Sequence, residues 1–338
     1  MGFLFALAVD RLTLPLLTKP QEVCMNQASQ WRLAILEPIA SIFSKEPKLK
    51  AIIVGGSATR DQADQYSDTE LGLFWSELPS LEKQMAMLAA VGGRPQFGKI
   101  YPFTHRHQPY EPGGYSPFII GQAPPGGTRA DEYPASESGY PIAMEQDTVA
   151  GAEEWLADVI DDLDRAPKKL GLLAFIQTGI PLHGQALVQT WRRKIEVYPE
   201  LLAVKIIEAA LKSLRWKLWQ LHIWIARREC LMLYHEIEAI AQDLFNLLAA
   251  LNRRYFPSDF KWLDQRIQSL KIKPQGLSSR LRQAFQLQPD ESLPHLRQLT
   301  AEILELVSQY GPPLDPVLQD EIWTSRWRTW KGPPEGWG

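Results

Sequence analysis

Two acidic residues two positions apart, Asp68 and Glu70, stand at the start of an apolar run that ends at Trp75. Such a run predicts a β-strand, and side chains at positions i and i+2 of a strand point to the same face of the sheet. A same-face pair of carboxylates is a common way to hold Mg²⁺, which takes oxygen ligands and bridges phosphate groups. The pair therefore indicates a site for a divalent cation and a phosphate-bearing ligand.

A glycine-rich turn precedes this pair in the chain. The apolar run 51–54 ends in Gly55, Gly56 and Ser57, a pattern typical of a buried strand that leads into a tight turn. Exposed backbone N–H groups in such a turn, together with the Ser57 hydroxyl, suit the phosphates of a nucleoside triphosphate. We expect Arg60 to assist in binding these phosphates.

Together these residues resemble a known signature. Gly55-Gly56-Ser57, a spacer and then Asp68-x-Glu70 is similar to the pattern of the DNA polymerase beta-type nucleotidyltransferase superfamily. The segment SDTELGLFW, residues 67–75, and the chain after it resemble a poorly characterised bacterial branch close to the aminoglycoside nucleotidyltransferases. The resemblance implies two Mg²⁺ ions held by Asp68 and Glu70. It also implies transfer of a nucleoside monophosphate, AMP from ATP in the first place, to a hydroxyl group with release of pyrophosphate.

The resemblance further implies a third carboxylate on a neighbouring strand, which binds metal or activates the attacking hydroxyl. We expect this strand at 141–149, where the family position falls on Ala143. Glu145 is two residues further along, on the same face, and can take over the role of catalytic residue and metal ligand. Asp147 shares that face nearer the strand end. The Ala143 departure leaves open a module that binds nucleotide without turnover, and a protein-modifying (AMPylating) enzyme of the same fold is a further alternative.

Composition sets broad limits on the protein class. The chain has 338 residues, enough for two domains, with 45% hydrophobic and 22% charged residues. A net charge of −3 and a pI near 6.1 argue against nucleic acid as a partner, because binding it needs a basic face. Two cysteines exclude a disulfide framework. We expect a cytoplasmic protein without membrane association, whose partners are a nucleoside triphosphate and a small-molecule acceptor; no oligomeric state follows from the sequence.

The spacing of apolar residues and of Gly and Pro divides the chain. Residues 27–43 and 80–91 have helical spacing around the predicted strands, and 92–140 is a Gly-, Pro- and Tyr-rich rim with an edge strand near 98–102. From 151 onward helical segments follow one another almost to the end. We therefore predict an α+β protein with a small mixed sheet followed by a helical bundle. Its expected parts are an N-terminal arm (1–24), with Met25 an alternative start, a nucleotidyltransferase domain (25–150), an acceptor-side bundle (151–331) and a flexible tail (332–338).

Some polar residues of the predicted bundle are candidates for the site. Relatives use a bundle lysine to contact the triphosphate, and we assign this role to Lys205. Arg227 and Tyr234 are candidates for the acceptor pocket. We expect Asn252 and Lys261 to be structural, tying the last helices together. Three tryptophans of the tail, Trp323, Trp327 and Trp330, form a helical stripe that suits packing.

Overall fold

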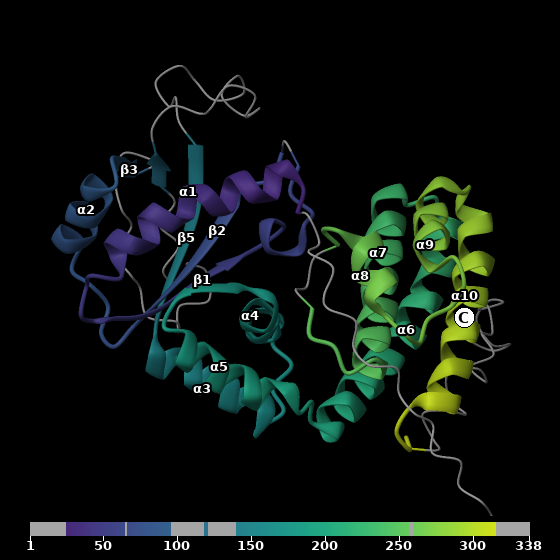
Figure 1. Ribbon diagram of the computed structural model, residues 1–338. Helices are drawn as coiled ribbons and strands as arrows, with labels where there is room; N and C mark the ends of the chain where they lie inside the picture. Colours follow the sequence, from purple (N-terminus) through teal and green to yellow (C-terminus); the bar gives the residue numbers. More distant parts are fainter. Residues whose placement is uncertain (1–24, 65, 96–117, 121–139, 257–259, 316–338) are drawn as a thin grey trace, which may run out of the picture.

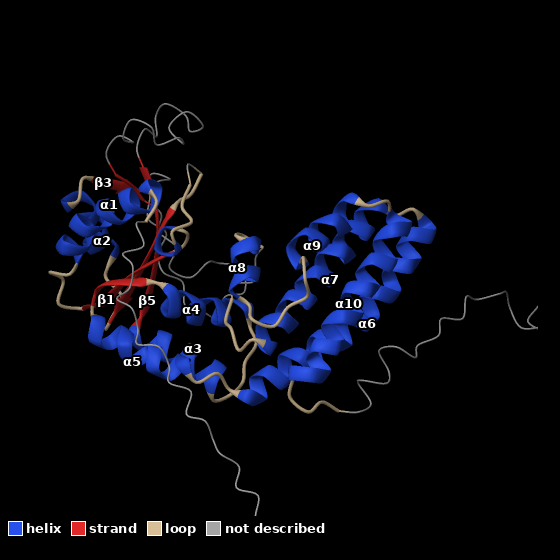
Figure 2. Ribbon diagram, turned by 45° about the vertical axis from the view of Figure 1, so that its right-hand side comes forward, coloured by secondary structure: helices blue, strands red, loops and turns tan. Residues whose placement is uncertain are grey.

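The computed structural model describes residues 25–64, 66–95, 118–120, 140–256 and 260–315 (Figure 1). These residues form an α+β fold in which a mixed sheet with helices on both faces is followed by a helical bundle (Figures 1 and 2). The predicted fold class is therefore confirmed. The N-terminal arm, the strand near 98–102, most of the rim and the tail with its tryptophan stripe lie outside the described residues.

Six described strands form the sheet, in the order β3-β4-β5-β2-β1-β6. β2 and β5 run parallel, and all other neighbours run antiparallel. The two strands predicted from apolar runs are β1 and β2, and the strand that the resemblance implies at 141–149 is β5. The strands are β1 (Leu49–Gly55), β2 (Thr69–Trp75), β3 (Gly93–Pro95), β4 (Phe118–Ile120), β5 (Tyr140–Thr148) and β6 (Ile180–His183).

One face of the sheet is covered by α1 (Gln27–Phe43) and α2 (Leu81–Ala90) (Figure 1). Every second residue of β2, including Leu71 and Leu73, is buried against these helices. α1 starts at Asn26, whose side chain accepts a hydrogen bond from the Ser29 N–H at 2.8 Å. It continues through Pro38. This face is a closed hydrophobic core.

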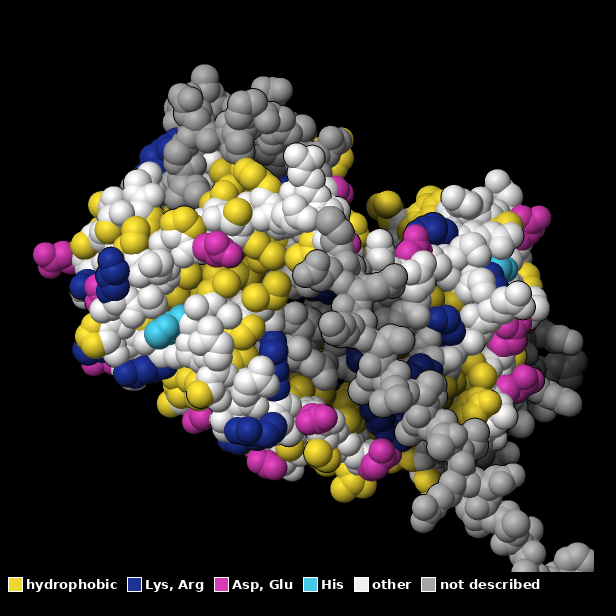
Figure 3. Space-filling model, viewed as in Figure 1, with side chains coloured by type: hydrophobic (Ala, Val, Ile, Leu, Met, Phe, Trp, Pro, Cys, Tyr) yellow, Lys and Arg dark blue, Asp and Glu magenta, His cyan; other side chains and the backbone are white. Residues whose placement is uncertain are grey.

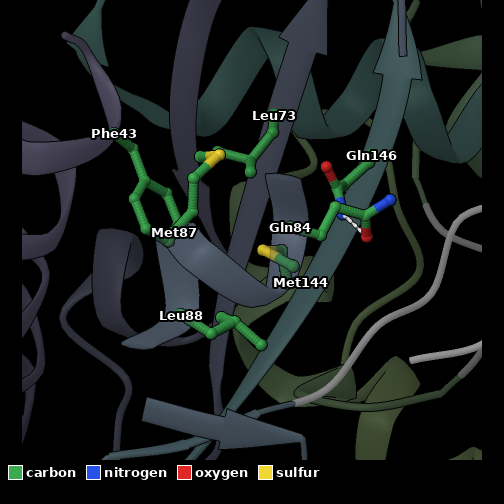
Figure 4. Close-up of a pocket in the computed structure, with 7 residues that line it drawn as sticks. All are labelled: Phe43, Leu73, Gln84, Met87, Leu88, Met144 and Gln146. Atoms are coloured by element: carbon green, nitrogen blue, oxygen red, sulfur yellow. Dashed lines mark hydrogen bonds between the residues drawn. The ribbon is translucent and has the colours of Figure 1, made fainter. Parts of the chain in front are cut away.

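The buried polar side chains at the α2 end of this core bond to one another. Trp75 Nε1 donates to Gln146 Oε1 at 3.0 Å, and Gln146 Nε2 donates to Gln84 Oε1 at 3.2 Å. Figure 4 shows the two glutamines facing each other beside a cavity of about 10 Å³, which is lined otherwise by apolar side chains. A space of this size has room for about one water molecule and none for a ligand.

The opposite face of the sheet is covered by α3 (Val149–Ile160), α4 (Pro167–Thr178) and α5 (Gln185–Glu196). Ala51, Ile53 and Phe74 point to this side, and the rings of Phe74 and Trp191 meet edge to face at 5.0 Å. α3 follows β5 directly because the Thr148 side chain accepts a hydrogen bond from the Gly151 N–H at 2.9 Å.

The domain boundary expected at residue 150 is not where the packing changes. β6 pairs with β1 and completes the sheet, and α3 to α5 pack on the sheet in a core that Leu202 and Tyr255 also join. The sheet lobe therefore extends to about Val197. In the sequence, Gly179-Ile180-Pro181 predicts a break between helices, and the structure has the edge strand β6 there. An edge strand tolerates proline, whose missing N–H can face away from the ladder.

The remaining helices form the bundle, which has its own core of leucine, isoleucine and alanine side chains. α6 leaves the sheet lobe, and α7 returns antiparallel to it, so that the end of α7 lies beside the start of α6. This closeness shows in the rings of Tyr198 and Tyr255, 4.7 Å apart, and in the 2.5 Å ion pair of Glu200 with Arg253. The helices are α6 (Glu200–Arg227), α7 (Cys230–Leu251), α8 (Leu263–Ser269), α9 (Leu277–Gln286) and α10 (Pro289–Tyr310).

Charged side chains are mixed over the surface. On the face shown in Figure 3, Lys and Arg side chains lie among Asp and Glu side chains on both lobes. None of the helices in the described part of the chain combines the length and the apolar character that crossing a membrane requires.

Candidate functional site

The register of the three central strands brings the predicted acidic residues to one face of the sheet. Glu70 pairs with Gly55 of β1 and with Ala143 of β5, and Glu145 pairs with Gly72. Since Leu71 and Leu73 point to the α1–α2 side, Glu70 points to the side of α3 to α5. Ala143 and Glu145 alternate with the buried Ile142 and Met144 and point the same way.

Glycine at position 56 makes room for the Glu70 carboxyl group. Gly56 has a φ of +73°, and a Cβ atom there would lie 3.0 Å from Glu70 Cδ. Both the backbone conformation and this close approach favour glycine. The Glu70 carboxyl thus lies directly against the turn that follows β1.

Gly55 and Gly72 serve a different purpose. A Cβ atom at Gly55 would lie 2.0 Å from the ring of Phe175, and one at Gly72 would lie 2.8 Å from it. The two glycines therefore form a slot in the sheet that holds the Phe175 ring of α4. Gly55, which we expected to contact phosphate, has at least this packing role, and its contact with nucleotide stays a prediction.

Ser57 and Arg60 lie at the expected place beyond this turn. Ser57 is buried, and its carbonyl accepts hydrogen bonds from the N–H groups of Arg60 at 3.2 Å and Gln62 at 3.0 Å, which closes the short 3₁₀ helix Ala58–Arg60. The positive charge of Arg60 acts on the Glu70 carboxylate and opposes the rise of its pKa. The glycine turn, Ser57 and Arg60 are thus grouped at the Glu70 carboxyl.

The carboxylates act on one another electrostatically. Burial, first of all, and the negative charges of Asp68 and Glu145 raise the pKa of Glu70 to about 7, even though the positive charges of Arg60 and Lys261 oppose the rise. Desolvation also raises the pKa of Glu145, against the opposing charge of Lys168, although part of the Glu145 side chain is open to solvent. The site is therefore rich in negative charge and holds a proton near neutral pH.

Arg32 of α1 fixes the loop that delivers Asp68. This arginine is only 4% exposed, and its guanidinium donates to the carbonyls of Ser67 at 2.6 Å and Asp64 at 2.7 Å. One residue after Asp68, the Thr69 hydroxyl bonds to the Tyr140 hydroxyl at 2.6 Å. Asp68 is thus held between two anchored neighbours.

Two lysines that the sequence analysis did not predict as site residues act on the carboxylates. Lys261, which we expected to be structural, acts on Glu70 from the segment before α8, and Lys168 acts on Glu145 from the first turn of α4. Only folding could reveal them, because neither has a spacing relation to the carboxylates in the sequence. Lys205, our candidate for this position, is exposed, and its carbonyl accepts a hydrogen bond from Arg165 at 3.0 Å. Lys205 is not among the charges that shift Glu70, and its phosphate contact stays a prediction.

The acceptor candidates Arg227 and Tyr234 lie elsewhere. Arg227 is at the end of α6, which is about 40 Å long at 1.5 Å per residue, and the other end of this helix adjoins the sheet lobe. Both side chains are exposed, and the Arg227 guanidinium lies 5.8 Å from the centre of the Trp224 ring. The helical hairpin thus carries both side chains away from the sheet, and their role in the acceptor pocket stays a prediction.

Among the described residues, no group of three His, Cys, Asp or Glu side chains is arranged to hold a metal ion. Glu145 as a third metal ligand stays a prediction. The Asp68–Glu70 pair fits Mg²⁺ in the mode in which one or two carboxylates and the substrate's phosphates share the ion.

Comparisons with known proteins add little on function. A family model described as a domain of unknown function (DUF4037) matches residues 168–263, less than a third of the chain, and these bounds enclose Lys168 and Lys261. A search of curated proteins found no match. A solved structure titled as a nucleotidyltransferase-like protein from Exiguobacterium sibiricum 255-15 is similar over 88% of this chain and 81% of its own, with 9% identity and a TM-score of 0.38. This likeness is too low to carry an argument about the reaction.

Proposed function

We propose that the protein is a metal-dependent nucleotidyltransferase that moves a nucleoside monophosphate, AMP from ATP in the first place, onto a hydroxyl group of a small molecule. The observation that carries this proposal is the Glu70 carboxyl, held against the Gly56 turn with Asp68 and Glu145 close enough to raise its pKa. Three acidic groups on one face of the sheet repel one another when ionised, so they favour a cation at this place. The basic side chains of Arg60 and Lys261, which act on Glu70, suit the phosphates of a bound nucleotide.

Each side chain then has a distinct role. Asp68 and Glu70 hold Mg²⁺, which, when bound, neutralises charge on the phosphates. The Gly56 turn and Ser57 bind the phosphates through N–H and hydroxyl groups, and Arg60 and Lys261 add positive charge. Lys205 remains a candidate for a further phosphate contact.

The group transfer itself is a substitution at the α-phosphorus. The acceptor oxygen forms a bond to this phosphorus, the bond from phosphorus to the bridging oxygen of pyrophosphate breaks, and pyrophosphate leaves with the electron pair. Glu145 takes the proton of the acceptor hydroxyl. Its raised pKa and its opening to solvent suit a base that must exchange protons near neutral pH.

Thermal unfolding tests the nucleotide site. ATP with Mg²⁺ at 100 times its Kd stabilises a folded protein by about 2.7 kcal/mol. We expect Asp68→Asn combined with Glu70→Gln to abolish most of the rise in melting temperature. Glu82→Gln, an exposed carboxylate of α2, is the matched control and should keep the rise. A full rise in the double variant would place the nucleotide elsewhere and refute the proposal.

A nucleotide-binding module without turnover is the second candidate, and Ala143 favours it. This alanine pairs with Glu70 on β5, at the position where a family carboxylate would lie. In a binding module, no acceptor would yield pyrophosphate with the wild type, and only Ala143→Asp could restore release.

Mass spectrometry of a cell extract incubated with the protein, ATP and Mg²⁺ would identify the acceptor. A labelled protein in that extract would favour the AMPylating alternative.

A further inference from the structure

A second candidate site lies where the bundle meets the sheet lobe. It is a cavity of about 340 Å³ between the start of α4, the facing sides of α6 and α7, and residues 254–256. Small side chains on both long helices, among them Ala210 and Ala249, leave this space open. Its volume falls in the range of small-molecule sites.

The charges around the cavity favour an anion. Among its described lining residues, Arg165, Arg254 and Asp243 are charged. Asp243 forms an ion pair with Lys217 at 2.7 Å, which balances its charge. Arg165 and Arg254 are exposed, and their charges leave the lining of the cavity with a net positive charge.

The other end of the cavity is aromatic. Tyr198, Tyr255 and Phe256 line it, and the two tyrosine rings lie 4.7 Å apart at an angle of 31°. Tyr255 is only 5% exposed, and its hydroxyl has no hydrogen-bond partner among the described residues. A buried hydroxyl without a partner is costly to the free energy of folding. The aromatic surface itself offers the cavity a flat apolar wall.

Two segments that line the cavity also carry the basic side chains that act on the carboxylates. Pro167 and Leu170 line the cavity, and Lys168 between them in the sequence acts on Glu145. Arg254 lines the cavity, and Lys261, seven positions later, acts on Glu70. The cavity and the carboxylate site thus share these two segments of the chain.

We propose that this cavity binds the acceptor, and that the acceptor is a small ring compound with a hydroxyl and an anionic group rather than a polycation such as an aminoglycoside. The anionic group contacts Arg165 and Arg254, and the ring packs against the aromatic end. This inference rests on the proposed nucleotidyltransferase function.

Calorimetric titration with matched probes tests the charge preference. The probes are 4-hydroxybenzoate against 4-hydroxybenzamide, glucose 6-phosphate against glucose, and kanamycin, each added to the full chain with Mg²⁺ and a non-hydrolysable ATP analogue. We expect at least one anion to bind about tenfold more tightly than its neutral partner and than kanamycin. A tenfold difference in Kd is the usual scale for a hydrogen bond to a charged group. Preferred binding of 4-hydroxybenzoate would indicate that a carboxylate is recognised, and preferred binding of glucose 6-phosphate would indicate a phosphate.

Variants assign the binding to this cavity. Arg165→Gln with Arg254→Gln should abolish the preference for the anion, while Arg228→Gln, an exposed arginine at the far end of α6, should keep it. Failure of both anions to bind, equal binding of kanamycin, or an unchanged preference in the double arginine variant would overturn the inference.

Titration of Mg²⁺ and ATP separates this test from that of the proposed function. If nucleotide binding depends on Asp68 and Glu70 while the anion preference is absent, the inference fails alone. If nucleotide binding does not depend on them, the proposed function fails, and the acceptor assignment falls with it whatever the probes do.

Discussion

Thr69 and Glu70 are neighbours in one strand, yet they have opposite surroundings. The Thr69 hydroxyl points into the α1–α2 core and bonds to Tyr140, and the core polar groups around Trp75 are likewise paired. Glu70 points to the other face, where Asp68 and Glu145 repel it and Gly56 leaves room for its carboxyl group. The strand thus contributes stability with one face and chemistry with the other.

This contrast implies that substitutions on the two faces have separable effects. Changes on the α1–α2 side should alter the free energy of unfolding and leave ligand binding intact. Changes on the α3–α5 side should alter binding or turnover, and some should stabilise the protein, because functional sites often hold groups that the fold alone would not select.

The largest expected effect is on turnover, from Glu145→Gln. Loss of a general base should lower the rate of pyrophosphate release by about a hundred- to ten-thousand-fold while ATP binding remains. Asp147→Asn is the control, because Asp147 lies on the same face but accepts a hydrogen bond from the Thr148 N–H at 2.7 Å. Full activity of Glu145→Gln would remove Glu145 from the mechanism and leave Asp68 and Glu70 as the only catalytic carboxylates.

Leu73→Ala tests the opposite face of the same strand. Leu73 is 1% exposed in the α1–α2 core, and a buried leucine cut to alanine costs about 2–5 kcal/mol of the free energy of unfolding. The Kd for ATP of the folded protein should not change. Denaturant unfolding and titration of the same variant measure the two quantities, and a large loss of affinity would show that the two faces are not separable.

Glu70→Gln should stabilise the free protein above neutral pH. A folded pKa of about 7, against 4.5 for the ordinary side chain, means that the folded state keeps a proton that the unfolded state has lost. The free energy of unfolding therefore falls as the pH rises from about 4.5 to about 7, and glutamine removes this fall. We expect a gain of about 2 kcal/mol at pH 8 and little gain at pH 4.5.

Chemical denaturation at both pH values measures this effect, and a variant less stable than the wild type at pH 8 would contradict it. The same proton must leave when Mg²⁺ binds to the ionised carboxylate. Stabilisation of the wild type by Mg²⁺ and ATP should accordingly weaken as the pH is lowered from 8 to 6.

The smallest expected effect comes from Tyr140→Phe. It removes the 2.6 Å hydrogen bond to Thr69, which is worth about 1 kcal/mol of stability. Since Thr69 immediately precedes Glu70, this variant asks how far the two faces are independent. An unchanged Kd for ATP would support the contrast, and a tenfold loss would show that Tyr140 also positions the carboxylate.

Sequence patterns predicted those elements that have a strong local signal. The predicted helix at 27–43 agrees with α1 residue for residue, and strand alternation placed Glu145 on the face of Glu70. β6 and the lobe boundary were missed, because a four-residue edge strand with proline has little local signal. Lys168 and Lys261 were missed for another reason: only the packing of α4 and of the segment before α8 brings them to the carboxylates.

Strand β6 has a consequence for how the protein is made. β1 is an almost fully buried strand, and one of its edges is covered by a partner that lies about 125 residues later in the chain. At the usual 5–20 residues per second of synthesis, that edge waits about 6–25 s for its partner. During this interval the nascent chain presents an unpaired apolar strand, which is a template for association with other chains. Slower translation in the cold should therefore lengthen the exposure, and a chaperone that covers extended apolar segments should raise the yield of soluble protein.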